Sequence, residues 1–439
     1  MGDGACCVVE GFQAGAQAFE VGPVRREAAG ASVQVGDDAR RMPGEGAAEG
    51  GKRFPARVGI SGAAGKAGSI PVIMDCDPGH DDAIALVLAL GRRNPDDAGE
   101  PFNMAYLALR GSAATNAVSR LHAEVSRAIF APLFPRLPLA EIPVGHVTNG
   151  VHVPSWLAGQ MALLYDKHFP ADWKSRIQEP GVWQCIHEVD PGELWETHNA
   201  LKNNLLSFVR RRVSRQCRRR GESDEVVEAA RRVLDPRVLT IGFGRRFATY
   251  KRAHLLFRDP ERLEAIINSK DRPVQFIFAG KAHPKDNEGK GIIRSLVDFG
   301  RRTNLRHRFL FLEDYDMHIA RFLVQGADVW LNTPRRPMEA CGTSGMKAAL
   351  NGVLNVSTMD GWWCEGYSPK LGWRIGNGEE YQDHNFQDSV ESQALYNIIE
   401  NEVAPLYYDR PSGGMPTAWL KMMKASMKMA MAGFCSLRM

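Results

Sequence analysis

The sequence predicts an α/β fold built on a doubly wound parallel sheet, and three observations lead to that class. From residue 237 onward, strand-like runs alternate with helical segments. The strand-like runs are continuously apolar, as expected for strands buried on both faces. The 439 residues are 44% hydrophobic and 24% charged, which is typical of a globular chain able to bury a sizeable core.

Five strands are predicted in this region, and helices are predicted to follow the second, third and fourth. Ligands bind at the carboxyl ends of the strands in such sheets, so the functional residues are expected just after each strand. The predicted strands are 238–244, 274–280, 308–315, 328–332 and 353–360, and the helices are 290–302, 317–325 and 344–352.

The chain before this region is less regular. Residues 1–69 are rich in Gly and Ala and predict a disordered tail. Helical spacing predicts helices over 103–133 and 156–235, and a strand-like run precedes the turn at Asn149 and Gly150.

A short acidic segment follows a predicted strand at 70–76 and reads DCDPGHDD. Carboxylates clustered at the end of a strand suit a hard cation such as Ca²⁺. The segment resembles the opening strand and loop of the nucleoside hydrolases, over 70–90. That resemblance implies that Asp77 and Asp82 are calcium ligands and that Asp81 is the base that activates water.

A basic run, RRRVSRQCRRR, occupies 210–220 and precedes an acidic helix start that Ser223 is expected to cap. One interpretation is a contact with a polyanion. We favour a solvated helix face balanced by neighbouring acids, because no aromatic residues for base stacking are interleaved with the arginines.

Four cations follow the first strand of the sheet, in the segment GRRFATYKR at 244–252. A strand-to-helix turn of this kind is an anion site, because backbone N–H groups and the helix dipole add to the side-chain charge. Arginine also contributes bidentate phosphate contacts. From these residues alone, two interpretations of the segment are possible, a phosphate-binding site and a basic turn that is simply solvated.

Small residues and a lysine follow the fourth strand, in the segment EACGTSGMK at 339–347. The small residues allow a ligand to approach the backbone. Lys347 lies about one turn into the predicted helix, and its amine could act as a nucleophile toward an aldehyde. Together with the cationic loop and Glu339, it favours a phosphorylated aldehyde as cofactor.

The segments EACGTSGMKAALNGVLNVSTMDG and GRRFATYKRA resemble the α-glucan phosphorylases, which comprise glycogen, starch and maltodextrin phosphorylases. The resemblance extends over about 90–439 and includes the motifs NMAYLALRGSAATNAVSRLH, HVTNGVHVPSWLA, FAGKAHP and PLYYDR. It implies a cytoplasmic, allosterically regulated family of glycosyltransferases with two Rossmann-like domains of the GT-B type. It implies the catalytic, pyridoxal-phosphate-binding domain for residues 91–439.

The resemblance also implies roles for individual residues. Lys347 would hold pyridoxal 5′-phosphate as a Schiff base, and Arg246, Lys251 and Glu339 would act with it in catalysis. Arg245, Gly342, Thr343, Tyr315 and Trp156 would contact the cofactor, and Asn149, Glu339, Cys341 and Gly342 the sugar. The implied reaction converts an α-1,4-glucan and inorganic phosphate into glucose 1-phosphate and a shortened glucan, with the cofactor's phosphate in the acid–base step.

The sequence departs from the family at Cys341, where Ser is usual, and at Ala117, where Gly is usual. The family's N-terminal domain is largely missing, so we expect weak or no phosphorolysis from this chain alone. Three alternatives stay open. They are a nucleoside hydrolase, a non-catalytic glucan-binding remnant, and a related glycosyltransferase such as glycogen synthase.

Composition excludes several partners. The net charge of +4 is too mild to indicate nucleic acid, and no apolar run approaches the length of a membrane span. No secretory signal is evident, and the scattered cysteines include no CxxC pair, so a reducing cytoplasm is expected. The resemblance allows a homodimer.

Overall fold

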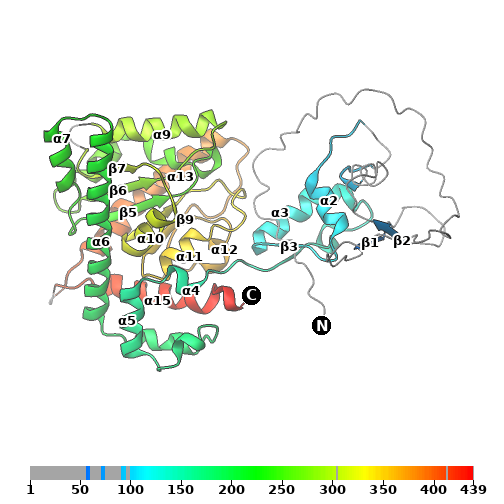
Figure 1. Ribbon diagram of the computed structural model, residues 1–439, viewed down its shortest axis with the longest axis horizontal. Coiled ribbons are helices and arrows are strands. Elements are labelled where there is room, and N and C mark those ends of the chain that lie inside the picture. The colour runs from blue at the N-terminus through cyan, green and yellow to red at the C-terminus, as the bar shows by residue number, and fades with distance from the viewer. Residues whose placement is uncertain are drawn as a thin grey trace, which may run out of the picture. The chain divides into compact units, whose positions relative to one another are not determined.

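The computed structural model describes residues 56–59, 71–74, 90–94, 99–302, 305–411 and 414–438. The chain divides into two compact units (Figure 1). The smaller unit contains all described residues up to 115, together with 127–143, and the larger contains 116–126 and everything described from 144 onward.

In the smaller unit, two short strands pair antiparallel, with Ala56 opposite Met74. They are β1, Ala56–Gly59, and β2, Pro71–Met74. Strand β2 confirms the strand predicted over 70–76. Strand β1 lies within 1–69, the range expected to be a disordered tail, and the rest of that range lies outside the described residues. The acidic segment after β2 lies outside the described residues, and so do the expected roles of Asp77, Asp81 and Asp82.

The segment 103–133, for which helical spacing was expected throughout, forms two helices separated by a short strand. Helix α2, Met104–Gly111, begins after Asn103, whose side chain accepts from the Ala105 amide. Helix α3 covers Arg120–Phe130. Between the two helices, β3, Asn116–Ala117, pairs in parallel with β4, Gly145–His146. The helical prediction fails there because this backbone forms its hydrogen bonds with another strand.

The larger unit contains a six-stranded sheet in which all neighbouring strands are parallel. The strand order is β10-β9-β8-β5-β6-β7. All five predicted strands are confirmed, and β10 was missed, because its short run includes the exposed Arg374. The strands are β5, Leu239–Gly244; β6, Val274–Ala279; β7, Phe309–Leu312; β8, Val329–Asn332; β9, Leu354–Thr358; and β10, Gly372–Ile375.

Both faces of the sheet are buried, which confirms the doubly wound class. Successive side chains of a strand point to opposite faces. Accordingly Phe276 and Phe278 belong to one apolar cluster, while Ile277 and Ala279 belong to another, which includes Leu205 of helix α6. Figure 1 shows α6 running alongside β5, β6 and β7.

Helices connect the strands and cover the sheet. The predicted helices after β6, β7 and β8 are confirmed as α9, α10 and α11. The helices of this part are α8, Pro260–Ile267; α9, Asn287–Gly300; α10, Met317–Gly326; α11, Ser344–Ala349; α12, Trp363–Gly366; α13, His384–Ile398; α14, Ala404–Tyr408; and α15, Thr417–Gly433.

The predicted helical stretch 156–235 is interrupted over 169–190, where the backbone forms 3₁₀ turns. Pro170 and Pro180 explain part of this break, because proline cannot donate the helix hydrogen bond.

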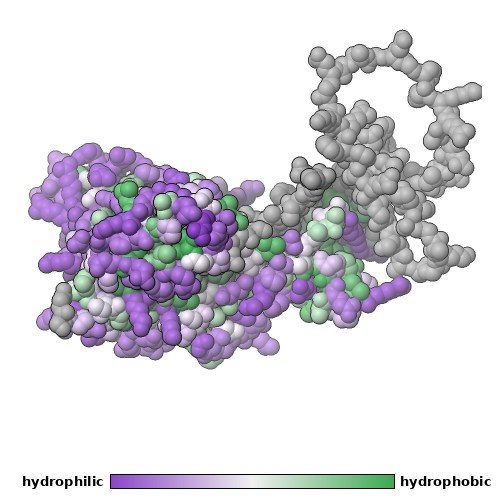
Figure 2. Space-filling model, turned by 90° about the horizontal axis from the view of Figure 1, so that it is seen from below, coloured by the Kyte–Doolittle hydropathy of each residue, from purple (hydrophilic) through white to green (hydrophobic). Residues whose placement is uncertain are grey.

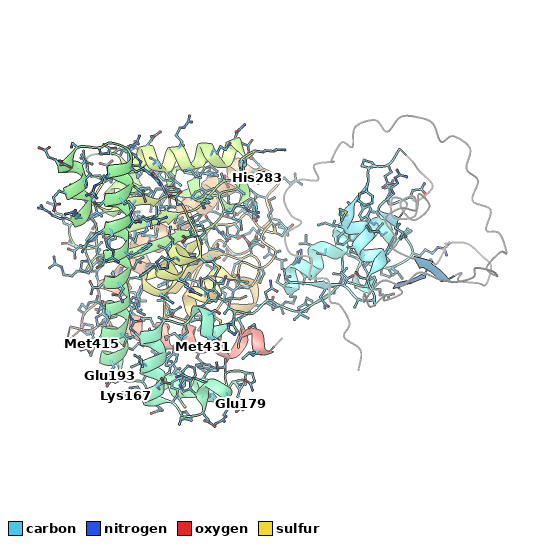
Figure 3. All side chains as sticks on the ribbon, viewed as in Figure 1. Lys167, Glu179, Glu193, His283, Met415 and Met431 are labelled. Carbon is cyan, nitrogen blue, oxygen red and sulfur yellow. The ribbon has the colours of Figure 1, made fainter. Side chains whose placement is uncertain are left out.

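An ion pair joins the two helices on either side of this break. Figure 3 shows Lys167 of α5 and Glu193 of α6 close together, and the two side chains form that ion pair. The helices are α4, Val153–Trp156; α5, Gly159–His168; α6, Pro191–Arg219; and α7, Asp224–Ala229.

A fully buried ionic cluster fixes α6 to the sheet. Asp328, which precedes β8, accepts from Lys202 Nζ at 2.5 Å and from His198 Nε2 at 2.8 Å. The Thr240 amide of β5 donates to the same carboxylate at 2.7 Å. Buried charges are tolerated only when paired in this way.

Acids and backbone carbonyls of the protein bind arginines of the basic run, but the ion pairs do not involve the neighbouring acids that the favoured interpretation expected. Arg219 and Arg220 form ion pairs with Glu313. Arg210 donates to two backbone carbonyls, and Ser223 caps α7 as expected. The acids that balance the run therefore come mainly from the end of β7.

The face of the larger unit drawn in Figure 2 is covered mainly by hydrophilic residues, with hydrophobic residues visible between them. Within the described part of the chain, no helix has the length and apolar character required to cross a bilayer.

Candidate functional site

The site lies at the carboxyl ends of β5 and β8, the two adjacent strands at which the strand order reverses. The chain winds from β5 outward to β7, then returns and winds the other way from β8 to β10. A doubly wound sheet opens a crevice for ligands at such a reversal. Both segments that the sequence analysis selected, 244–252 and 339–347, follow these two strands.

Three charged side chains from the two loops meet in this place. Glu339 Oε2 lies 2.7 Å from Lys251 Nζ and 3.1 Å from Arg245 Nη2. Arg245 and Lys251 are each only 8% exposed, so these contacts are shielded from water. Two cations share one carboxylate oxygen, which leaves the group with excess positive charge suited to an anion.

Burial changes the titration of this group. Burial and the nearby Arg245 lower the pKa of Lys251 to about 8, although Glu339 acts to raise it. Burial alone would raise the pKa of Glu339, but Arg245 and Lys251 hold it below its ordinary value. Glu339 is therefore ionised at neutral pH, and Lys251 gains or loses its charge near pH 8.

Arg246 differs from its two cationic neighbours because it is exposed, and its side chain bonds to that of Tyr250. The prediction that a helix dipole assists this loop is wrong. The backbone after β5 forms 3₁₀ turns at Thr249–Lys251 and Ala253–Phe257 before α8 begins. The positive potential here comes from side chains.

Gly280, at the end of β6, sets the path of the cationic loop. A Cβ atom at this position would lie 2.1 Å from the Arg245 carbonyl oxygen and 2.3 Å from the Phe247 ring. The Arg245 amide also donates to the Ala279 carbonyl at 3.1 Å. Only glycine allows the loops after β5 and β6 to lie this close.

Lys347 lies in α11, the helix that follows the β8 loop. Its Nζ is 4.1 Å from the centre of the Trp156 ring. The Asn351 side chain donates to the carbonyls of both Trp156 and Lys347, which fixes the two residues relative to each other. The structure thus brings together two residues that the resemblance assigns to one cofactor.

Tyr315 packs beside the start of the cationic loop. Its hydroxyl donates to the Gly244 carbonyl at 3.2 Å. A Cβ atom on Gly244 would meet Tyr315 and Trp330 at 3.4 and 3.1 Å. Trp330 Nε1 donates in turn to Ser344 Oγ at the start of α11. This chain of contacts joins the Lys251 loop to the Lys347 helix.

The small residues around Cys341 follow a backbone that requires glycine. Gly342 has φ of +82°, a region that favours glycine. Cys341 is buried, and its carbonyl accepts from the Trp362 amide at 2.8 Å. Thr343 precedes α11, and its carbonyl accepts from the Lys347 amide.

Asp360, after β9, supports the same loop. Its Oδ2 accepts from the Glu339 amide and its Oδ1 from the Gly361 amide, both at 2.8 Å. Burial, with a contribution from the negative Glu339, raises the pKa of Asp360 to about 8.

Asn149 is connected to the site through the β3 segment. Its amide donates to the Val118 carbonyl at 3.0 Å. Ser119, which follows Val118 in the chain, donates through its hydroxyl to the Ala340 carbonyl at 2.6 Å. Asn149 is therefore attached near the 339–342 loop through the residues that follow β3. Ala117, at the family's usual glycine, is buried in this strand.

Several buried polar atoms near the site have no hydrogen-bond partner among the described residues, and they include Arg245 Nη1 and Asn332 Oδ1. An unpaired guanidinium N–H in a shielded place is costly unless a ligand satisfies it. Together with Lys251 and the exposed Arg246, this unpaired donor suits an anion such as a phosphate group.

Three residues that support the site are not among those predicted from the sequence. Asp360 follows a predicted strand, so its position was an available signal. Arg252 belongs to the motif GRRFATYKRA but was given no role, and it proves fully buried. Asp388 lies on α13 without any sequence signal, and it binds Arg252.

Comparison with known proteins gives a consistent result. A family model described as carbohydrate phosphorylase matches residues 95–366. A glycogen phosphorylase of Aquifex aeolicus is 44% identical over 356 residues, covering 81% of this chain and 50% of the relative. A maltodextrin phosphorylase of Thermococcus litoralis is 42% identical over 353 residues, covering 80% of this chain and 41% of the relative.

A glycogen phosphorylase of Mycobacterium tuberculosis is 44% identical over 342 residues, covering 78% of this chain and 39% of the relative. The chain therefore spans half or less of the length of these curated relatives.

Proposed function

The chain belongs to the carbohydrate phosphorylase family, and we propose that its larger unit carries the cofactor and phosphate site of an α-1,4-glucan phosphorylase. The reaction would transfer a glucosyl unit from the glucan to inorganic phosphate and release glucose 1-phosphate. The observation that carries the proposal is the convergence of Lys251, Arg245 and Glu339 at the strand reversal.

The positive group is suited to inorganic phosphate and to a cofactor phosphate placed beside it. Lys251 offers a compact charge, and Nη1 of Arg245, which has no partner among the described residues, carries two N–H groups that can donate. Arg246 is exposed next to them and can reach a second anion. Bringing two phosphates together requires cations fixed in advance, and the ion pairs with Glu339 supply that order.

Family members are generally dependent on pyridoxal phosphate, and the residues here fit that cofactor. Lys347 would hold its aldehyde carbon, with Trp156 and Tyr315 against the ring and Gly342 and Thr343 near its phosphate. When bound, the cofactor supplies an acidic phosphate group for proton transfer. The protein residues then orient that phosphate, exclude water and hold the substrate phosphate.

The sugar would lie against the 339–342 loop. Glu339 keeps its charge at neutral pH and can accept from a sugar hydroxyl. Gly342 permits close approach of a sugar ring, and the segment after β3, to which Asn149 is bonded, is fixed to the loop through Ser119. Cys341 is a weaker hydrogen-bond donor than the Ser usual in the family.

Trapping of pyridoxal phosphate tests the proposal directly. Purified protein is incubated with the cofactor, reduced with borohydride and digested, and the modified peptide is identified by mass spectrometry. We expect one adduct, on Lys347, and none in Lys347→Ala. An adduct distributed over surface lysines, unchanged in the variant, would contradict the proposal.

Phosphorolysis is measured separately, as release of glucose 1-phosphate from maltodextrin and phosphate. Activity that requires added pyridoxal phosphate and disappears in Lys347→Ala supports the full reaction. Glucan binding without cofactor loading would instead favour the non-catalytic alternative. Nothing in the described residues supports the nucleoside-hydrolase alternative, and a homodimer stays a prediction.

A further inference from the structure

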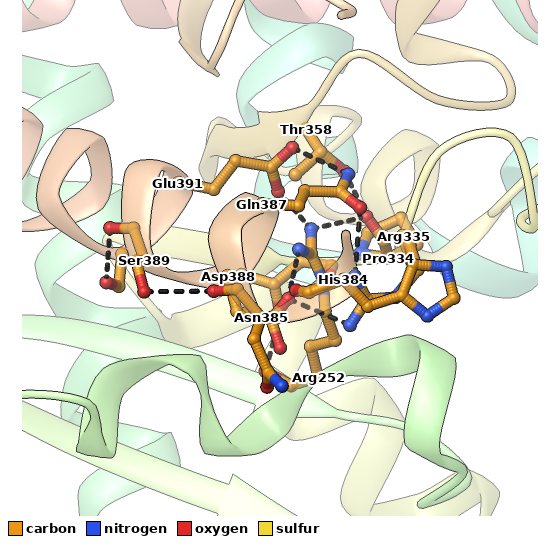
Figure 4. Close-up of polar contacts among 12 residues, drawn as sticks. Arg252, Pro334, Arg335, Thr358, His384, Asn385, Gln387, Asp388, Ser389 and Glu391 are labelled. Atoms are coloured by element: carbon orange, nitrogen blue, oxygen red, sulfur yellow. Dashed lines mark hydrogen bonds and ion pairs between the residues drawn. The ribbon is translucent and has the colours of Figure 1, made fainter. Parts of the chain in front are cut away.

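A single carboxylate on α13 connects the two loops that form the site. Asp388 Oδ1 accepts from Arg252 Nη1 and from Arg335 Nη2, each at 2.9 Å (Figure 4). Arg252 belongs to the loop after β5, and Arg335 to the loop after β8. Asp388 is 5% exposed, so this shared contact is shielded from water.

Arg252 is the first arm of this connection and follows Lys251 in the chain. It is fully buried, and its φ of +45° places its backbone in the left-handed region. Its Nε donates to the Thr333 carbonyl at 3.0 Å and its Nη2 to the Pro334 carbonyl at 2.9 Å. Strained backbone of this kind persists only where its surroundings hold it.

Arg335 is the second arm and lies four positions before Glu339. Its Nη1 donates to Gln387 Oε1 at 2.9 Å. Its backbone amide donates to the Tyr250 carbonyl at 2.7 Å, so the two loops also touch directly. The segment that ends in Glu339 is thus fixed to α13 and to the Lys251 loop.

The cluster is balanced in charge. Glu391, one turn after Asp388, accepts from Arg252 Nη2, and its Oε1 accepts from Gln387 Nε2 at 3.0 Å. Burial opposes ionisation of Asp388, but His254 and Arg252 hold its pKa far below the usual range. Two carboxylates and two guanidinium groups therefore pair with one another in a buried hydrogen-bond network.

We propose that Asp388 is a positioning residue that sets the spacing between Lys251 and Glu339. It acts through Arg252 on one side and through Arg335 on the other. The inference rests on the proposed function in one respect, which is that phosphate binds beside Lys251 and Glu339. Misplacement of a binding group by about 1 Å can cost about 100-fold, so a residue remote from the ligand can matter.

Asp388→Asn tests the proposal, because it keeps the size of the side chain and removes the charge that holds two arginines. Ser389→Ala, at the next position of the same helix, is the matched control, because the Ser389 hydroxyl bonds to Arg258 and to the Asn385 carbonyl of α13 and not to Arg252 or Arg335. Crystal structures of both variants give the distance between Lys251 Nζ and Glu339 Oε2. Calorimetry gives the affinity for inorganic phosphate.

We expect this distance to exceed hydrogen-bond range, about 3.5 Å, in Asp388→Asn and to stay at 2.7 Å in Ser389→Ala. We expect phosphate affinity to fall roughly tenfold or more in Asp388→Asn alone. If Asp388→Asn keeps the 2.7 Å spacing, the proposal is overturned.

A second variant, Arg335→Lys, tests the same proposal if Asp388→Asn fails to fold. Arg335→Lys keeps the charge and the Arg252 arm but loses the forked contact to Asp388 and Gln387, and the same increase in distance is expected. Should wild-type protein bind no phosphate, the proposed function fails, whereas the spacing in the variants still decides the role of Asp388.

Discussion

The amine of Lys251 lies 2.7 Å from Glu339 Oε2, so an ion pair joins the loop after β5 to the loop after β8. The two residues are 88 positions apart in the chain. They meet because β5 and β8 are adjacent parallel strands whose carboxyl ends lie at one edge of the sheet. The sheet thus assembles a charged site from loops that are each too short to fold alone.

Phosphate binding should depend on pH through Lys251. The pKa of this amine is lowered to about 8, so its charge is lost as pH rises through that value. Inorganic phosphate is already mainly doubly charged there, so the ligand contributes little further change. We expect phosphate affinity, measured by calorimetry between pH 7 and 10, to fall with a midpoint of about 8.

Lys251→Arg is the control, because arginine stays charged throughout this range. Its phosphate affinity should be flat where that of wild-type protein declines. An equal decline in the variant would show that another group titrates.

Removal of the Glu339 charge should shift that midpoint downward. Glu339 stabilises the charged form of Lys251, while burial and Arg245 oppose it. In Glu339→Gln the opposing effects remain and the stabilising one is lost. We therefore expect the decline in phosphate affinity to begin at lower pH than in wild-type protein. A midpoint that moves upward, or does not move, would contradict this ion pair as the controlling contact.

Much of this site could be predicted from sequence, for a physical reason. Continuous apolar runs such as 274–279 are typical of strands buried in a parallel sheet. Once these strands are predicted, the loops that follow them are expected at the same edge of the sheet. The cations at 245–251 and Glu339 were therefore selected before their contacts were known. It could not be predicted that Arg245 and Lys251 share one oxygen of Glu339, because side-chain partners depend on the register between β5 and β8.

The contacts of Asp388 could not be predicted from the sequence. It lies in a polar stretch of α13, where Asp and Glu are expected to be solvated. Its partner Arg252 is 136 residues earlier in the chain, and no local spacing connects them. The same limitation applies to β10, whose four residues are defined only by pairing with β9.

Gly280→Ala should disturb the cationic loop. The added methyl group would collide with the Arg245 carbonyl oxygen and the Phe247 ring, at 2.1 and 2.3 Å. Overpacking of this kind costs about 1–3 kcal/mol, so thermal unfolding should occur at lower temperature and phosphate binding should weaken. Unfolding is followed by calorimetry and binding by titration with phosphate.

Gly291→Ala is the matched control, because a Cβ there meets nothing within 4 Å and the residue lies in α9. It should be neutral or stabilising by about 0.5–1 kcal/mol. If both alanine variants behave alike, the close approach at Gly280 is not what holds the loop.

Asp328→Ala should destabilise the larger unit strongly. It leaves Lys202 buried without its carboxylate, and breaking a buried pair costs about 3–5 kcal/mol. Denaturant unfolding measures the loss. Asp314→Asn serves as control, since Asp314 pairs with Arg219 on the surface and asparagine tolerates its φ of +57°. Comparable losses in the two variants would mean that the buried cluster is no more important than a surface ion pair.

Trp156 should control how firmly Lys347 retains pyridoxal phosphate. The ring lies 4.1 Å from Lys347 Nζ and covers one side of it. Trp156→Phe keeps an aromatic face and Trp156→Leu removes it, so affinity should fall in that order, by about 0.5–2 kcal/mol for the leucine variant. Absorbance titration with pyridoxal phosphate gives the dissociation constants. Trp195→Phe is the matched control, because Trp195 stacks on His198 instead of on Lys347. An equal loss of affinity in Trp156→Phe and Trp195→Phe would show that general packing, and not the contact with Lys347, retains the cofactor.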